Sequence, residues 1–389
     1  MRVLHVVNNL DPRLGGSVEA ARLMASGMAE HGAQVEVLSL VEPQRAWLDH
    51  WPVPVHGLGS THTSYLYTPR LGAWLGENAP RFDAVIVHGI WRYASAGVAR
   101  ALRKHATPFY LYIHGMLDPW FASAYFWKHR KKVLFWKALE HRSLRDARAV
   151  LFTNQEEMAS AGKKFRPYRC RGKIVPYGAA PPPGDPRKQR EVFLQRFPET
   201  AGSRVILSLG RIHRKKGCDL LIQAFADIAR TDRRLRLVLA GPDDESWKPE
   251  LVRMSQEAGV DHRITWTGYL EGDMKWGAFH AAEVFALPSH GENYGYSVVE
   301  ALSCSLPVLI SHKVNIWREI VDDGAGLAAA DDLPGTVATL REWLRLDPTE
   351  FQDMRDRARH CFDQRFELRG CIQRLLDFLM AEAILAKAA

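Results

Sequence analysis

The feature that most constrains the fold of this chain is an alternation of short β-rich runs with amphipathic helical segments, which occurs in both halves of the 389 residues. Such alternation is typical of βαβ units and parallel sheets. In the first half the expected strands are Val3–Val7, Val35–Leu40, Ala84–Val87, Phe109–Ile113 and Ala149–Phe152. In the second half they are Val205–Leu209, Arg236–Ala240, Ile264–Trp266, Val284–Leu287 and Val308–Ile310. The pattern therefore predicts two doubly wound α/β domains.

Helical segments are expected between these strands. In the first half Ser17–His31 has helical character, and Gly32 lies where a C-terminal glycine is expected. In the second half the expected helices are Asp219–Arg230, Lys248–Ala258, Met274–Ala282 and Tyr296–Leu302. After Asp322 the sequence predicts helix to the end of the chain, because apolar residues recur at helical spacing over 372–379.

A proline-rich stretch separates the two halves. Pro176–Pro186 contains three consecutive prolines and two glycines, so it can continue neither a helix nor a central strand. We expect an N-terminal domain over 1–180, a C-terminal domain over 181–365, and a helix over 366–389 that can pack back on the first domain. Ligands of open α/β sheets bind beyond the carboxyl ends of the strands, so the loops after strands are the segments that matter for function.

The charge balance favours anionic partners. The formal net charge is +8 and the sequence pI is about 9.2, which suits nucleotide phosphates, anionic lipid or nucleic acid. Nucleic acid is not expected, because no motif for it is visible and the aromatic residues do not alternate with basic ones.

The expected cellular compartment follows from the lack of a membrane span, of a signal peptide and of paired cysteines in the sequence. No apolar run reaches the ~18 residues of a membrane span, and the N-terminus predicts a first strand without a signal peptide. The five cysteines are scattered without a C-x-x-C pair, so free thiols are expected. We expect a cytoplasmic protein, with peripheral binding to the inner face of the membrane as a further option.

The segment Leu207–Cys218 carries the first chemical signal. A strand ends, Gly210 follows, and Arg211 and Lys216 lie in the loop before a helix. Two cations and a glycine at the start of a helix suit a diphosphate. The alternative is a solvated basic loop, because two further cations, Arg214 and Lys215, lie there as well.

The segment Ser289–Val308 carries the second chemical signal. Glu292 and Glu300 are separated by seven residues, and a helix starting near Tyr296 would point its N–H groups towards a ligand above 293–297. Glu300, inside this helix, can accept hydrogen bonds from a diol such as ribose, and Glu292 lies in the loop. The alternative is two unrelated surface glutamates.

Together these segments resemble family 4 of the retaining glycosyltransferases. The shared pattern is Gly210-Arg211 with Lys216-Gly217, then Glu292 and Glu300, then the small-residue stretch Ala301–Pro307. The resemblance covers nearly the whole chain and implies the GT-B architecture, with two Rossmann-like domains facing each other across a cleft. The run Gly115–Trp120 resembles a subgroup seen in surface-polysaccharide assembly.

The resemblance also implies roles for individual residues. Arg211 and Lys216 would hold the diphosphate, Glu300 the ribose, and Glu292 the donor sugar, as a catalytic residue. The remaining donor-binding residues that it implies are Gly15 and Gly16 in the glycine-rich loop after the first strand, Gly268 and Tyr269 beside the base, and Asn293, Tyr294, Gly295 and Ser297 around the start of the helix. As a lone pair, Gly15 and Gly16 are explained equally well by a tight turn.

Histidines follow two strands of the first half. By the resemblance His114 is catalytic and touches the donor sugar across the cleft, while His88 and Trp91 lie on the acceptor side. The alternative for each histidine is a structural hydrogen bond at the strand end.

No metal or cofactor is expected besides the donor substrate, a UDP- or GDP-sugar. No Asp-x-Asp motif follows a strand, and both Asp243-Asp244 and Asp322-Asp323 are typical of turns. The charge of the leaving diphosphate would then be offset by Arg211, Lys216 and helix dipoles.

The segment Trp120–Arg148 mixes aromatic and basic residues. Such a helix can lie on an anionic membrane, or it can pack its apolar face on the sheet and leave a solvated basic face. A membrane surface would suit a lipid-linked acceptor.

The expected reaction is transfer of a sugar, with retention, from a nucleotide diphosphate to a glycan or lipid-linked saccharide in surface polysaccharide or glycoconjugate biosynthesis. The alternatives are a GT-B sugar-nucleotide epimerase and a non-catalytic nucleotide-sugar-binding subunit. A nicotinamide oxidoreductase is not favoured, because no Gly-x-Gly-x-x-Gly follows the first strand.

Overall fold

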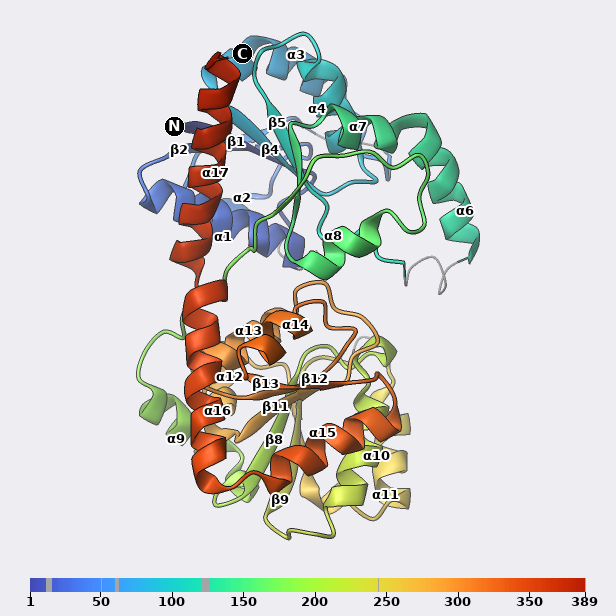
Figure 1. Ribbon diagram of the computed structural model, residues 1–389, viewed down its shortest axis with the longest axis vertical. Coiled ribbons are helices and arrows are strands. Elements are labelled where there is room, and N and C mark those ends of the chain that lie inside the picture. Colours follow the sequence, from blue (N-terminus) through green and yellow to red (C-terminus); the bar gives the residue numbers. More distant parts are fainter. Residues whose placement is uncertain (12–15, 50, 60–62, 120–125, 244, 389) are drawn as a thin grey trace. The chain divides into compact units, whose positions relative to one another are not determined.

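The computed structural model describes residues 1–389 apart from 12–15, 50, 60–62, 120–125, 244 and 389. The chain forms two compact units (Figure 1). Unit 1 comprises Met1–Gly178 and Leu368–Ala389, and unit 2 comprises Ala179–Glu367. The chain thus passes between units at 178/179 and 367/368, where the sequence placed boundaries at 180/181 and 365/366.

Unit 1 contains a seven-stranded sheet of order β3-β2-β1-β4-β5-β6-β7, in which every pair is parallel. The strands are β1 (Arg2–Val7), β2 (Gln34–Ser39), β3 (Val55–Gly57), β4 (Ala84–His88), β5 (Phe109–Tyr112), β6 (Ala149–Phe152) and β7 (Gly172–Ile174). The five expected strands are present. The two edge strands were not predicted, because three residues carry too little periodicity to detect.

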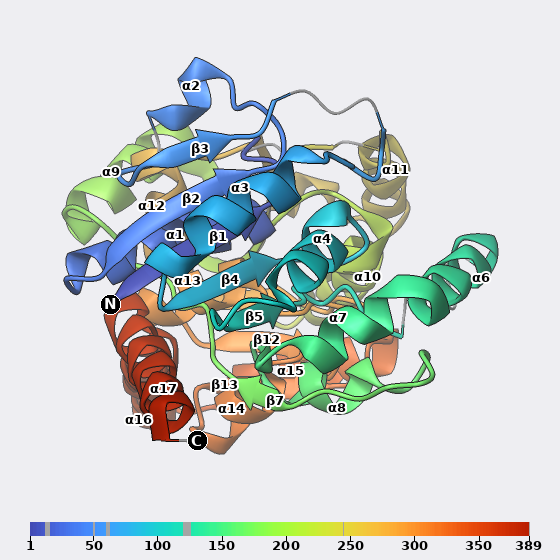
Figure 2. The same ribbon diagram turned by 90° about the horizontal axis from the view of Figure 1, so that it is seen from above.

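The helices of unit 1 connect these strands. They are α1 (Gly16–Glu30), α2 (Arg45–Leu48), α3 (Arg70–Asn78), α4 (Tyr93–Leu102), α6 (Phe126–Phe135), α7 (His141–Asp146), α8 (Gln155–Ala161) and α17 (Leu368–Ala388), with a π-helical segment at Trp136–Glu140. Figure 2 shows α6 extending away from the sheet.

The terminal helix α17 joins unit 1 through charge and close packing. Gly27 of α1 lies against Ile372, where a Cβ would stand 2.8 Å from Cγ1. The buried carboxylate of Glu382 accepts hydrogen bonds from Arg148 at 2.8 Å and from Arg171 at 2.7 Å. Helix α17 is therefore bound to the rest of unit 1 at Ile372 and Glu382.

Unit 2 contains a six-stranded parallel sheet of order β10-β9-β8-β11-β12-β13. The strands are β8 (Arg204–Leu209), β9 (Leu235–Ala240), β10 (Ile264–Gly268), β11 (Val284–Leu287), β12 (Val308–Ser311) and β13 (Gly326–Ala329). Two parallel sheets confirm the predicted pair of doubly wound domains.

The prediction of helix from 322 to the end was wrong at β13. Helix α14 (Trp317–Asp322) ends, and Gly324 adopts a left-handed conformation with φ 65°. Gly326 then lies against the backbone of Val308, where a side chain would overlap the carbonyl oxygen. Small residues therefore pair with β12 here, although their composition gives no strand signal.

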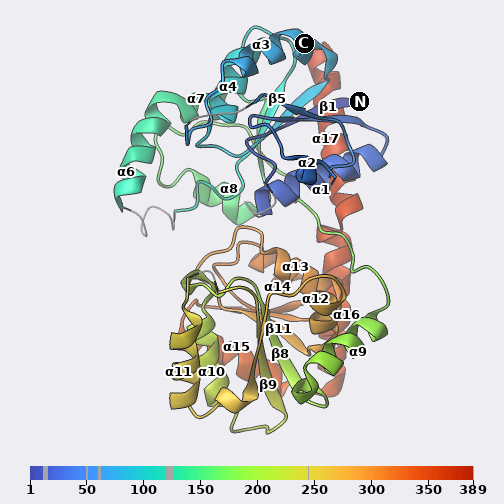
Figure 3. The same ribbon diagram turned by 180° about the vertical axis from the view of Figure 1, so that it is seen from behind.

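The helices of unit 2 cover both sides of its sheet. They are α9 (Pro186–Arg196), α10 (Cys218–Ile228), α11 (Lys248–Glu257), α12 (Gly272–Ala281), α13 (Tyr296–Ser303), α14, α15 (Leu333–Arg345) and α16 (Pro348–Cys361). Figure 3 shows α10 and α11 on one side of the sheet and α9 and α12 on the other. Within the described residues, no helix combines the length and apolar character needed to cross a membrane.

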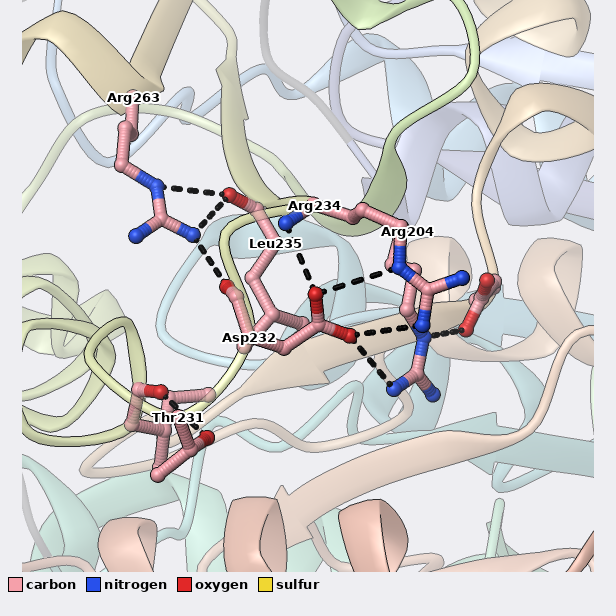
Figure 4. Close-up of polar contacts among 8 residues, drawn as sticks. Arg204, Thr231, Asp232, Arg234, Leu235 and Arg263 are labelled. Atoms are coloured by element: carbon pink, nitrogen blue, oxygen red, sulfur yellow. Dashed lines mark hydrogen bonds and ion pairs between the residues drawn. The ribbon is translucent and has the colours of Figure 1, made fainter.

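A cluster of arginines pins the turn between α10 and β9 (Figure 4). Asp232 accepts hydrogen bonds from the Arg234 backbone N–H at 2.8 Å and from the Arg204 guanidinium at 3.3 Å. The Arg263 guanidinium donates to the carbonyl oxygens of Asp232 and Leu235. Bonds from Arg234 and Arg204 lower the pKa of Asp232 to about 2.

Asp232→Asn is expected to change how stability depends on acid. The folded pKa lies below the ordinary value of ~3.9, so the carboxylate stabilises the fold above pH ~4 and loses this contribution as pH falls towards 2. Because the side chain is partly exposed, we expect the variant to be destabilised by only about 1 kcal/mol at pH 6 and less at pH 3. Urea unfolding at both pH values measures this, and an equal loss at the two would contradict it.

Candidate functional site

Lys216 and Glu292 meet at the carboxyl edge of the unit 2 sheet. Strands β8 and β11 are neighbours, so the loops that follow them lie side by side. The Lys216 ammonium donates a hydrogen bond to Oε1 of Glu292 at 2.5 Å, and the two side chains are only 19% and 15% exposed. Arg211, in the same loop as Lys216, is exposed. The structure therefore brings together a cation and a carboxylate that the sequence identified in separate motifs.

The two loops are held together by their backbones. Gly217, the N-cap of α10, has φ 69°, and a Cβ there would overlap the carbonyl oxygen of Pro288. The Ser289 hydroxyl and the His290 N–H both donate to the carbonyl of Lys215 at 2.8 Å. The residue that follows Lys216 must be a glycine, because only glycine permits this close approach of the two backbones.

The loop after β9 packs against the loop after β8 and fixes its backbone. Gly241, after β9, has φ 145°, and a Cβ there would overlap the carbonyl oxygen of Gly210. The Gly210 N–H donates to the Ala240 carbonyl, and the Ile212 N–H donates to the Pro242 carbonyl, both at 2.8 Å. Sequence reasoning treated 241–244 only as a turn and missed this supporting role.

The second glutamate has a cation of its own. Glu300 lies on α13, which begins after Gly295 in a left-handed conformation with φ 67°. Lys275 of α12 donates to Oε1 of Glu300 at 2.5 Å. Sequence reasoning did not select Lys275, because no local pattern marks a lysine inside a predicted helix as the partner of a distant glutamate.

The loop after β12 was also missed. A parallel bridge joins Glu292 to Val314. The Glu292 N–H donates to the Lys313 carbonyl at 2.8 Å, and the Asn315 N–H donates to the Glu292 carbonyl at 2.9 Å. The backbone of Glu292 is therefore held on both sides, and the position of β12 next to β11 is the reason.

The other predicted donor residues of unit 2 lie at the same sheet edge. The Tyr294 ring is buried 5.2 Å from that of Tyr296, so only its backbone can face a ligand. Asn293 accepts a hydrogen bond from Asn315 at 3.4 Å, and Ser297 lies half-buried in the first turn of α13. Gly268 ends β10, and the side chain that follows it, Tyr269, is 69% exposed.

In unit 1 three histidines form a hydrogen-bonded chain at the strand ends. Nδ1 of His5 lies 2.9 Å from Nε2 of His88, and Nδ1 of His88 lies 3.1 Å from Nε2 of His114. The chain continues from Nδ1 of His114 to the Tyr177 hydroxyl at 2.5 Å and ends on the other side at the Met28 sulfur, 3.4 Å from Nε2 of His5.

The Met28 sulfur determines which atom donates in each hydrogen bond of this series. A thioether only accepts, so His5 carries its proton on Nε2, each following imidazole donates through Nε2, and Tyr177 donates to His114. Burial lowers the pKa of His5 and His114 to about 3 and that of His88 well below its usual value, so all three are neutral. Both ring nitrogens of His88 and of His114 are therefore engaged inside unit 1. A contact between a ring nitrogen of His114 and a ligand would have to replace one of these hydrogen bonds. The backbone at His114 has φ 52°.

The loops around these histidines are held by buried carboxyl groups. Glu157 accepts from the Gly115 N–H at 2.6 Å and from the Thr153 N–H at 2.7 Å. The backbone N–H of Trp91, a residue with φ 71°, donates to Oε1 of Glu140 at 3.1 Å. Of the predicted N-terminal loop, Gly16 is the first, exposed residue of α1, and Gly15 lies outside the described residues.

The surroundings of Glu140 suit a protonated carboxyl group, because the side chain is fully buried. Oγ of Ser95 lies 3.0 Å from both Glu140 oxygens and 3.1 Å from the Arg92 carbonyl, although a hydroxyl has one proton to donate. If Glu140 is protonated, it donates to Ser95, and Ser95 donates to Arg92. Burial correspondingly raises the pKa of Glu140 to about 7.

Glu140→Gln is therefore expected to stabilise the protein in alkaline solution. A folded pKa raised above the ordinary ~4.3 means that stability falls as pH rises from ~4.3 to 7. Glutamine keeps the two hydrogen bonds without ionising, so we expect a gain of about 1–2 kcal/mol at pH 8 and little change at pH 5. Urea unfolding at both pH values tests this, and a variant that is destabilised at pH 8 would show that burial does not disfavour the ionised form of Glu140.

The basic segment expected over 120–148 divides into packed and exposed parts. Trp136 is fully buried in the core, and the half-buried Phe135 packs 5.2 Å from Tyr65. Leu134 is 71% exposed. The exposed basic side chains beside it are Arg130, Lys131 and Lys137. The first residues of the segment, 120–125, lie outside the described residues.

Two glycosyltransferase families match the chain. The family described as "Glycosyl transferases group 1" matches residues 189–360, and "Glycosyl transferase 4-like domain" matches residues 15–178.

In the described part of the chain, no three His, Cys, Asp or Glu side chains form a group that could hold a metal ion.

Curated relatives match shorter stretches. The chain is 28% identical over 155 residues to alpha-D-kanosaminyltransferase of Streptomyces kanamyceticus, which is 40% of this chain and 39% of the relative. It is 29% identical over 205 residues to D-inositol 3-phosphate glycosyltransferase of Kineococcus radiotolerans, which is 48% and 46%. The chain thus spans less than half the length of these relatives.

Among solved structures, Alr3699/HepE of Anabaena in complex with UDP and glucose superposes with a TM-score of 0.76 at 17% identity. The match covers 98% of this chain and 100% of the Anabaena chain. The predicted GT-B fold is confirmed.

Proposed function

Because the chain belongs to the group 1 glycosyltransferases, we propose that it is a retaining, metal-independent glycosyltransferase that moves a sugar from a nucleotide diphosphate to a glycan or lipid-linked saccharide. Surface polysaccharide or glycoconjugate biosynthesis is the proposed setting. The UDP and glucose that the Anabaena structure contains support a UDP-sugar donor.

One observation carries this proposal: cations and carboxylates meet at one sheet edge in unit 2. Lys216 contacts Glu292 and Lys275 contacts Glu300, both at 2.5 Å, in loops and helices that follow parallel strands. Diphosphate binding needs the cations, and sugar or ribose hydroxyls need the acceptor oxygens. Both ion pairs are half-buried and lie beyond the carboxyl ends of parallel strands, where open α/β sheets bind their ligands.

The proposed chemistry divides roles among these residues. Arg211 and Lys216 bind the diphosphate and offset the charge that develops when the bond from C1 to the phosphate oxygen breaks. Glu292 orients the donor sugar and Glu300 the ribose. The acceptor oxygen then bonds to C1 on the same face, and its proton passes to the departing diphosphate, which accounts for retention without an enzymic nucleophile.

The test is a donor panel followed by product analysis. Thermal shift with UDP-, GDP- and ADP-sugars identifies the donor, because a ligand at a hundred times its dissociation constant adds ~2.7 kcal/mol of stability. Turnover is then assayed with saccharide acceptors in EDTA, and the anomeric configuration is read by NMR. Binding without transfer to any acceptor favours a non-catalytic subunit. Donor conversion without an acceptor favours an epimerase.

We also propose that unit 1 binds anionic membranes through the exposed basic side chains of the 130–137 segment. Wild-type protein is expected to float with anionic liposomes at low salt and to be released as salt rises, because the Debye length falls from ~10 Å at 0.1 M to ~3 Å at 1 M. Each near-surface cation contributes ~1 kcal/mol. Replacing Arg130, Lys131 and Lys137 by glutamine should abolish flotation.

The control removes the same charge from unit 2, where Lys188, Arg190 and Arg233 are exposed. Their triple glutamine variant should float like the wild type. If both triple variants lose binding equally, the attraction depends only on net charge. If the wild type does not float, the segment is a packed helix with a solvated face.

A further inference from the structure

The ion pair of Lys275 has no role in the reaction described so far. Its ammonium lies 2.5 Å from Oε1 of Glu300 and 4.7 Å from the centroid of the Trp276 ring. The Lys275 and Glu300 side chains are 24% and 18% exposed. A carboxylate and an indole face thus hold this ammonium in one position between α12 and α13.

This position matters because of the charges that a nucleotide would bring. A nucleotide diphosphate carries negative charge to a sheet edge that already holds Glu292 and Glu300. Lys216 balances the first of these carboxylates, and Lys275 balances the second in the same way. Without a cation, a half-buried Glu300 next to a diphosphate would tend to protonate or turn towards solvent.

We propose that Lys275 is a positioning residue for ribose recognition: it holds the Glu300 carboxylate in an orientation in which it can accept hydrogen bonds from the ribose hydroxyls. The inference rests on the proposed nucleotide-sugar site. It adds a specificity residue from α12 to the proposed nucleotide-sugar site.

The consequence can be measured as discrimination between nucleotides with and without a ribose hydroxyl. The nucleoside diphosphate that binds the wild type most tightly, among UDP, GDP and ADP, is compared with its 2′-deoxy and 3′-deoxy forms by calorimetry. All forms carry the same charge, so the ratio of their dissociation constants is insensitive to the lost charge of a variant. A hydrogen bond to a charged group predicts a wild-type ratio of about ten- to a hundredfold for one deoxy form.

Lys275→Met should lower this ratio to about threefold or less, close to that of Glu300→Gln. Lys188→Met is the matched control, because it removes one exposed lysine from α9 of the same unit and should keep the wild-type ratio. A Lys275→Met protein with the full ratio overturns the inference, as does a wild type that binds nucleotide without discriminating against either deoxy form. A wild type that binds no nucleotide overturns the proposed function itself.

Discussion

Replacing Lys216 with methionine is expected to weaken binding of the donor nucleotide by about a hundredfold while the protein stays folded. A charge-assisted contact to a phosphate contributes ~1.5–3 kcal/mol, equivalent to roughly ten- to a hundredfold in affinity. The loss for the Lys216 variant should lie at the upper end of this range, because it also leaves the Glu292 carboxylate without the cation that lies 2.5 Å away. Arg211→Ala, which removes an exposed cation, should cost about tenfold.

The control for these variants lies in the same loop. Arg214 is exposed and pairs with Glu250 at 2.9 Å, a surface ion pair of small energetic value. Arg214→Gln should therefore bind the donor within about twofold of the wild type. Calorimetry with the donor nucleotide provides the comparison. Wild-type affinity in both the Lys216 and the Arg211 variants would rule out the diphosphate assignment.

Gly241→Ala is expected to have the largest effect on stability. With φ 145° the backbone is in a region used almost only by glycine, and a methyl group would overlap the carbonyl oxygen of Gly210. The atoms that this methyl group would meet are backbone atoms of Gly210 and Arg211, so the clash cannot be relieved by rotating a side chain. We expect a loss of at least about 3 kcal/mol together with loss of donor binding, because relief of the clash moves the Gly210–Arg211 segment.

Gly259 separates the effect of conformation from that of the clash. It also has a positive φ of 70°, but a Cβ there meets no atom within 4 Å. Gly259→Ala should cost about 1–2 kcal/mol and leave donor affinity unchanged. Urea unfolding and calorimetry on the two variants give both quantities. Equal costs, or a Gly241→Ala protein with wild-type affinity, would show that the loop after β9 does not support the loop after β8.

Several features of the fold follow from short stretches of sequence. The strands β6 and β11 were predicted to the residue, because each is a continuous apolar run with clear limits: Arg148 and Thr153 flank β6, and Glu283 and Pro288 flank β11. The motif lysine and glutamate, Lys216 and Glu292, were also identified locally, since each follows a strand and the carboxyl ends of parallel strands share one edge.

Other features depend on segments that meet only in the folded chain. Histidines His88 and His114 stood out as strand-end residues, but only the structure shows His5 and Met28 beside them and engages all their ring nitrogens. Lys275 became the partner of Glu300 in the same way.

Periodicity and turn chemistry act over a few residues, so the sequence by itself determined the two α/β domains, the strand-end motifs and the type of most elements, but not the strands β3, β7 and β13. The order of strands, the burial of a side chain and the atom that faces it depend on contacts between residues far apart in the chain. The tertiary structure alone therefore decided that Lys275 balances Glu300, that Gly241 supports Gly210, and that the final helix joins unit 1 through Glu382. Each of these is a close approach whose energy depends on distances of a few ångströms, and no local pattern encodes such distances.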